Sequence, residues 1–205
     1  MQSNPTLSPE PILGLILAGG RSSRMGGGDK PLLPLGGRPM LAHVIARLSP
    51  QVARLALSAN DDPARFEPFG LPVLPDAAPD RPGSLAGVLA GLDHAAAQGF
   101  ALVAVVPGDT PFLPPDLVAR LHAALGPAPL AYAVAGGRDH PACALWRTGL
   151  REPLRAGLEA GARRVGDWMR AQGARAAAFP DDAAFFNVNR PEDLAEAERR
   201  LAARA

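Results

Sequence analysis

A glycine-rich loop near the start of the chain holds residue types that bind anions. It follows the apolar run from Ile12 to Ala18 and contains five glycines, two serines, Arg21, Arg24 and Lys30. The chain has 21 basic residues, and Lys30 is the only lysine among them. Because an ammonium is a compact charge that the wide guanidinium cannot replace in a tight oxygen cage, this position is expected to need a lysine. Small residues after a buried strand also let backbone N–H groups approach an anion, so the loop is predicted to bind phosphate.

The loop differs from the two commonest phosphate-binding motifs. A Walker loop requires Ser or Thr directly after its lysine, whereas Pro31 stands at that position. A dinucleotide-binding fingerprint requires the spacing GxGxxG, which the glycines here do not have. The sequence therefore indicates a third kind of nucleotide site.

Two aspartates follow predicted strands and are candidates for the same site. Asp109 comes just after the unbroken apolar run from Phe100 to Val106, and Asp76 follows a short strand at Leu71 to Leu74. A carboxylate at the end of a buried strand is costly unless it is solvated, paired or bound to a cation. Magnesium suits such a position, since it takes one or two carboxylates together with water and phosphate oxygens. The alternatives are a turn aspartate at 109 and an ordinary loop aspartate at 76.

The elements that must position these residues alternate between strand and helix patterns. In a mainly parallel sheet flanked by helices, ligands bind beyond the carboxyl ends of the strands, so the loop, Asp76 and Asp109 are expected to converge there. Further strands are predicted at 52–58, 130–134, 142–146 and 185–189, and helices at 40–48, 85–98 with Ser84 as N-cap, 115–125, 150–160, 165–172 and from 191 onward.

Size and composition favour one α/β domain. With 205 residues and 47% hydrophobic residues, the chain can bury a full core over 12–205, preceded by a flexible tail at 1–11. The net charge of +1 argues against a nucleic-acid surface. The first apolar run is far shorter than the roughly 20 residues that span a bilayer, so a cytoplasmic protein without a membrane partner is expected. The single Cys143 lies in an apolar stretch and is predicted to be a core residue.

Five ordered segments carry a resemblance to a known family. The residues at 17–30 (LAGGRSSRMGGGDK) resemble the signature of nucleotidyltransferases with a Rossmann-like sheet, and in detail that of the molybdenum cofactor guanylyltransferases. Segments 81–87 (RPGSLAG), 107–112 (PGDTPF), 138–141 (RDHP) and 186–194 (FNVNRPEDL) resemble that family in the same order. The resemblance covers the chain from about Gly14 to the last predicted helix. It implies a single Rossmann-like domain similar to the nucleotide-diphospho-sugar transferases.

The resemblance also implies an activity and a site. Such enzymes transfer GMP from GTP to the terminal phosphate of molybdopterin and release pyrophosphate, with Mg²⁺ as cofactor and a molybdoenzyme apoprotein or delivery chaperone as a further partner. The resemblance suggests a monomer, and the sequence leaves the oligomeric state open. Asp109 corresponds to the aspartate that holds magnesium, with Lys30 and Arg24 as further catalytic residues. The residues implied on the nucleotide side are Leu17, Ala18, Gly19, Gly20, Lys30, Asp76 and Asp109, and those on the pterin side are Asn187 and Asn189.

Several alternatives remain open at this level. Ser58 departs from a common family form with asparagine at that position, whereas Asn60 is present. A cytidylyltransferase, another small-molecule nucleotidyltransferase and a non-catalytic carrier of GTP or pterin are rival functions. His140 is either a structural hydrogen-bonding residue or a substrate contact. The arginines at 163, 164 and 170 form either a solvated helix face or a contact with the pterin phosphate.

Overall fold

A seven-stranded sheet forms the centre of the protein, with the order β5-β4-β1-β6-β8-β7-β9. The computed structural model describes residues 10–19, 30–60, 62–77 and 83–203. Within this seven-stranded sheet, the pairings are parallel except those of β8, which runs antiparallel to both β6 and β7. The strands are β1 (Ile12–Leu17), β4 (Arg54–Ser58), β5 (Val73–Leu74), β6 (Leu102–Pro107), β7 (Leu130–Ala135), β8 (Arg138–Arg147) and β9 (Arg175–Phe179), with a separate hairpin of β2 (Pro34–Leu35) and β3 (Arg38–Pro39).

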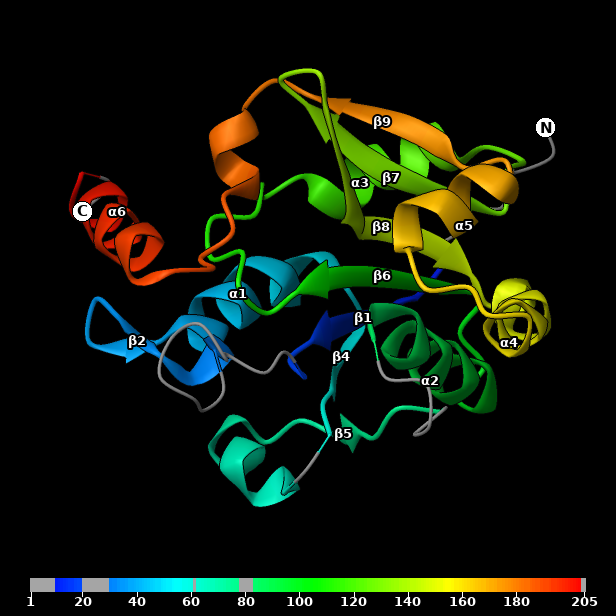
Figure 1. The fold of residues 1–205 in the computed structure, drawn as a ribbon, viewed down its shortest axis with the longest axis horizontal. Coiled ribbons are helices and arrows are strands. Elements are labelled where there is room, and N and C mark those ends of the chain that lie inside the picture. Colours follow the sequence, from blue (N-terminus) through cyan, green and yellow to red (C-terminus); the bar gives the residue numbers. More distant parts are fainter. Residues whose placement is uncertain (1–9, 20–29, 61, 78–82, 204–205) are drawn as a thin grey trace, which may run out of the picture.

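Helices cover both faces of this sheet (Figure 1). Helices α1 and α3 pack on one face, and α2, α4 and α5 pack on the other. The α-helices are α1 (Met40–Leu48), α2 (Ser84–Ala97), α3 (Leu117–Leu125), α4 (Arg151–Glu159), α5 (Val165–Ala171) and α6 (Pro191–Ala202). Short 3-10 helices are η1 (Lys30–Leu32), η2 (Ser49–Gln51), η3 (Pro63–Phe69), η4 (Thr148–Leu150) and η5 (Asp182–Phe185). The predicted mainly parallel α/β sheet is confirmed.

The central strand β6 shows why its sequence is apolar at every position. Val103 and Val105 face the core shared with α2, whereas Ala104 and Val106 face the core shared with α1 and α3. Because both faces are covered, the strand needs apolar residues throughout instead of an alternation. This apolar strand ends at Pro107, directly before the loop that carries Asp109.

Helix α2 lies close to β1 because two of its residues lack side chains. A Cβ at Gly91 would overlap the Leu15 side chain, and one at Gly87 would overlap the hydroxyl of Ser58. The predicted N-cap role of Ser84 is wrong: Gly83, with φ +145°, precedes the helix and Ser84 is its first residue. A positive φ of this kind is accessible to glycine at little cost.

The predicted strand at 185–189 is also wrong. This segment leaves η5 as an extended chain whose Val188 N–H donates to the Asp109 carbonyl at 2.9 Å. It is therefore hydrogen-bonded to the loop after β6 and not to the sheet. The strand at this edge is instead β9, whose alanine-rich sequence has low intrinsic β-propensity and gave no signal.

The remaining predicted elements are found with shifts of one or two residues at their ends, except the strand predicted at 142–146, which begins four residues earlier, at Arg138. The helix at 40–48 has the predicted bounds, and the strands predicted at 52–58 and 142–146 correspond to β4 and β8. Among the described residues, no helix is long and apolar enough to cross a membrane.

Candidate functional site

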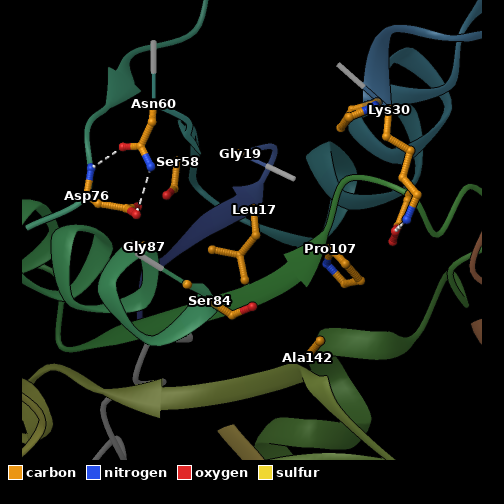
Figure 2. A pocket seen from close by; sticks show the side chains of 13 residues that line it. Leu17, Gly19, Lys30, Ser58, Asn60, Asp76, Ser84, Gly87, Pro107 and Ala142 are labelled. Atoms are coloured by element: carbon orange, nitrogen blue, oxygen red, sulfur yellow. Dashed lines mark hydrogen bonds and ion pairs between the residues drawn. The ribbon is translucent and has the colours of Figure 1, made fainter. Parts of the chain in front are cut away.

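A cavity of about 300 Å³ opens at the carboxyl ends of β1, β4, β5 and β6. Figure 2 shows Lys30 at one side, Asn60 and Asp76 at the other, and Leu17 and Gly19 between them. The described ends of the first loop (Leu17, Gly19 and Lys30), Asp76 and Asp109 meet at this cavity, as predicted. The residues that line the cavity are Leu17, Gly19, Lys30, Pro31, Ser58, Asn60, Asp76, Gly83, Ser84, Gly87, Pro107, Asp109 and Ala142.

Lys30 and Asp109 form an ion pair at this edge of the sheet. Lys30 comes from η1 and Asp109 from the loop after β6, and the Lys30 Nζ donates to Asp109 Oδ2 at 2.5 Å. The two side chains are only 15% and 16% exposed, so the charges are partly withdrawn from water. Charges held in such a setting act more strongly on a ligand than fully solvated ones.

The second oxygen of the Asp109 carboxylate has no hydrogen-bond partner among the residues that the structure describes. Oδ1 is buried, and no atom of the described residues forms a hydrogen bond with it. A buried carboxylate oxygen without a partner is costly, which indicates a ligand at this point. No cluster of three or more His, Cys, Asp or Glu side chains suited to a metal occurs in the described ranges. The single Asp109 carboxylate fits a cation such as Mg²⁺, which takes one or two protein carboxylates and completes its coordination with phosphate oxygens and water.

Asn60 holds Asp76 through two hydrogen bonds across the ends of β4 and β5. The Asn60 Nδ2 donates to Asp76 Oδ2 at 2.8 Å, and the Asp76 backbone N–H donates to Asn60 Oδ1 at 2.9 Å (Figure 2). This paired contact fixes the direction of the Asp76 carboxylate. The sequence indicated Asn60 only as a residue available near Ser58, because a contact over 16 residues between two loops has no local signal.

The first loop contributes to the cavity through the end of β1. Leu17 and Gly19 line it, whereas Ala18 is fully buried and its N–H donates to the Ser58 carbonyl at 2.8 Å. Gly20 and Arg24, which were assigned to the nucleotide side and to catalysis, lie outside the described residues.

The two C-terminal asparagines occupy different positions. Asn187 Oδ1 accepts a hydrogen bond of 2.6 Å from the hydroxyl of Thr110, a fully buried residue. Asn189 Oδ1 accepts one of 2.5 Å from Lys30 Nζ. Both also line a separate cavity of about 470 Å³ together with Arg138, His140 and Arg200. Asn189 thus lies between the two cavities.

His140 and the arginines at 163, 164 and 170 lie outside the first cavity. His140 Nε2 lies 3.0 Å from Asp182 Oδ1, and its ring stacks on Phe185, which is the hydrogen-bonding arrangement considered for it. Arg170 pairs with Asp167 at 2.5 Å, and all three arginines are exposed. Arg164 and Arg170 also line a further cavity of about 270 Å³.

Cys143 lies in β8 and is buried, as predicted. Burial raises the pKa of its thiol well above the usual range, and the charge of Asp109 raises the pKa further. The thiol is therefore neutral at physiological pH, and a neutral thiol is a poor nucleophile.

These features define a class of nucleotide-binding α/β protein, in which a loop after the first strand and a strand-end carboxylate share one cavity. A family profile described as "MobA-like NTP transferase domain" matches residues 14–176. The chain belongs to this family.

Individual relatives agree with that assignment. The chain is 55% identical over 190 residues to the molybdenum cofactor guanylyltransferase of Cereibacter sphaeroides, covering 93% of this chain and 97% of that protein. It is 47% identical over 204 residues to the protein of that name in Nitrobacter hamburgensis, covering 96% and 98%. The crystal structure of molybdopterin-guanine dinucleotide biosynthesis protein A from Archaeoglobus fulgidus has the same fold, with a TM-score of 0.75, 20% identity, and coverage of 93% and 99%.

Replacing Asn60 by alanine tests the paired contact with Asp76. Because both hydrogen bonds are lost and the carboxylate can rotate, Asn60→Ala is expected to weaken nucleoside triphosphate binding about three- to tenfold, measured by calorimetry. The matched control is Asp62→Ala, which removes the hydrogen bond from Ala64 N–H at the start of η3 in the same loop. Equal affinity of Asn60→Ala and the unchanged protein would contradict this role.

The Cys143 thiol is expected to resist alkylation. A thiol whose pKa is raised stays protonated until the pH exceeds that pKa, so native protein treated with iodoacetamide at pH 8 should remain unlabelled by mass spectrometry. The same protein unfolded in guanidinium chloride should take up one label. Rapid labelling in the native state would show that the residue is accessible.

Proposed function

We propose that this protein is a molybdenum cofactor guanylyltransferase, which transfers GMP from GTP to the terminal phosphate of molybdopterin and releases pyrophosphate. The observation that carries the proposal is the contact between Lys30 and Asp109 in a cavity at the strand ends. Two charged groups separated by 79 residues meet there. The chain belongs to a family of nucleoside triphosphate transferases, for which a paired ammonium and carboxylate are suitable groups. The names of the relatives at 47–55% identity supply the substrates.

The charges of the cavity favour one orientation of the nucleotide. Lys30 attracts the triphosphate, whereas the Asp76 carboxylate at the opposite side repels it. Asp76 instead suits the sugar or base, because a carboxylate accepts hydrogen bonds from hydroxyl and N–H groups. We assign Leu17, Ala18, Gly19, Gly20, Lys30, Asp76 and Asp109 to the nucleotide.

Asp109 is the residue proposed to hold Mg²⁺. Its buried Oδ1 forms no hydrogen bond with the described residues, so this oxygen is left for a cation while Oδ2 accepts from Lys30. The bound metal would supply positive charge to the phosphate oxygens. Lys30 and Asp109 together then provide both the cation site and a fixed ammonium next to it.

The reaction requires charge stabilisation more than proton transfer. An oxygen of the molybdopterin phosphate forms a bond to the α-phosphorus of GTP, and the bond from that phosphorus to the bridging oxygen breaks as pyrophosphate leaves. A phosphate dianion is already a nucleophile, so no general base is needed. The obstacle is repulsion between anions, and the Lys30 ammonium offsets it most where negative charge accumulates on the leaving group. We assign Arg24 the same role.

The acceptor is proposed to approach from the side of Asn187 and Asn189. Both line the 470 Å³ cavity, whose charged side chains are the cationic Arg138 and Arg200 and the anionic Asp182 and Asp193. The two asparagines offer neutral hydrogen-bonding groups to the acceptor there. We further propose that the product is delivered to a molybdoenzyme apoprotein or a chaperone. The protein is proposed to act in the cytoplasm.

A panel of nucleotides tests the reaction itself. With molybdopterin present, pyrophosphate release is expected with GTP and magnesium and to be at least tenfold slower with ATP, CTP or UTP. Fastest release with CTP would identify a cytidylyltransferase. Binding of GTP without any release of pyrophosphate would identify a non-catalytic carrier.

Substitution of the two charged residues tests their assignment. Lys30→Ala and Asp109→Ala are each expected to lower turnover by about 100- to 1000-fold, because one removes the ammonium that stabilises developing negative charge and the other removes the carboxylate proposed to hold Mg²⁺. The matched control is Asp93→Ala, which breaks an ion pair with Arg155 at 2.9 Å between α2 and α4. Turnover of the control should stay unchanged, and circular dichroism should show all variants folded. Normal turnover in either site variant would refute its role.

A further inference from the structure

We propose that Asn189 is a positioning residue for the Lys30 ammonium and so contributes to nucleotide binding, not only to the acceptor side. The inference rests on the proposed function, because it takes Lys30 to be the ligand of the GTP triphosphate. In this role Asn189 acts when the nucleotide binds, whether or not the second substrate is present.

Lys30 is held at its charged end by two residues. Its Nζ donates to Asp109 Oδ2 and to Asn189 Oδ1, both at 2.5 Å. An ammonium has three N–H donors. Within the described part of the chain, two donors are directed at these residues, which leaves the third for a phosphate oxygen. The two contacts therefore define the direction in which Lys30 can bind a ligand.

The chemical nature of Asn189 matters as much as its place. Asp109 compensates much of the ammonium charge, and a second carboxylate would reverse the sign of the group. The amide oxygen of Asn189 is neutral, so it fixes the ammonium without further lowering the positive potential that attracts the triphosphate. Because a lysine stem is long and flexible, an anchored head also loses less freedom when the nucleotide binds.

Asn189 is itself firmly held. Its backbone N–H donates to Asp193 Oδ2 at 2.8 Å, in the first turn of α6. The preceding Val188 is fully buried, and its N–H donates to the Asp109 carbonyl at 2.9 Å. The segment carrying Asn189 is thus hydrogen-bonded to the residue that forms the other contact with Lys30. The loop with Asp109 and the segment before α6 are thus joined to each other, and together they hold this ammonium.

Calorimetric titration with GTP and magnesium, without molybdopterin, separates the two roles of Asn189. If Asn189 positions Lys30, Asn189→Ala should weaken GTP binding about tenfold, as expected for loss of a hydrogen bond to a charged group. Asn189→Asp keeps an oxygen acceptor but adds a negative charge, so it should bind GTP more weakly still. If Asn189 contacts only the acceptor, both variants should bind GTP normally and raise only the KM for molybdopterin, which would overturn the inference.

Two further variants complete the experiment. Glu192→Gln changes an exposed residue in the first turn of α6 and should bind GTP within twofold of the unchanged protein. Lys30→Ala should weaken GTP binding at least as much as Asn189→Ala. If Lys30→Ala binds GTP normally, the proposed nucleotide site is wrong and the inference is overturned with it. If Lys30→Ala is weakened and Asn189→Ala is not, only the inference is overturned. Unchanged thermal melting of the Asn189 variants shows that the effects are local.

Discussion

The ion pair between Lys30 and Asp109 is the interaction on which the site depends. Two opposite charges lie 2.5 Å apart with little exposure to water, at the end of the central strand β6. Withdrawing both charges from water costs free energy, and their attraction alone need not repay it. The pair remains chemically incomplete, because Asp109 Oδ1 is buried without a partner in the described part of the chain. An incomplete pair of this kind offers a negative oxygen to a cation and an ammonium to an anion, and magnesium with a nucleoside triphosphate supplies both.

The sheet produces this arrangement through the direction of its strands. Because β5, β4, β1 and β6 are parallel neighbours, their carboxyl ends lie at one edge, and the loops with Asp76, Asn60 and Asp109 leave from that edge. The antiparallel strand β8 then closes the core beneath Asp109, with Cys143 buried there. Gly87 lets α2 approach so closely that its first turn lines the cavity.

How much the sequence could predict depends on how local each signal was. Lys30 was identified as the single lysine of a glycine-rich loop, and Asp76 and Asp109 because each follows a predicted strand. Their meeting is a consequence of parallel strands. The contacts of Asn60 with Asp76 and of Asn189 with Lys30 were not predicted, since they join residues 16 and 159 positions apart. The false strand at 185–189 has the same origin: its pattern is strand-like, but its hydrogen bonds go to the loop after β6. Local pattern specifies which residues are apolar, whereas the choice of partner is a property of the packed chain.

The C-terminal segment makes the geometry of the site depend on the folding of the whole chain. Val188, next to Asn189, is buried beside α6 and hydrogen-bonded to Asp109. The ammonium of Lys30 is thus oriented by Asp109 from the middle of the sequence and by Asn189 from its C-terminal part. A nucleotide that binds this ammonium therefore binds the packed state of residues 187–193 as well. Under the proposed function, binding of GTP is coupled in this way to the order of the segment that borders the 470 Å³ cavity. The same asparagine that orients the lysine toward one substrate thus borders the space assigned to the other.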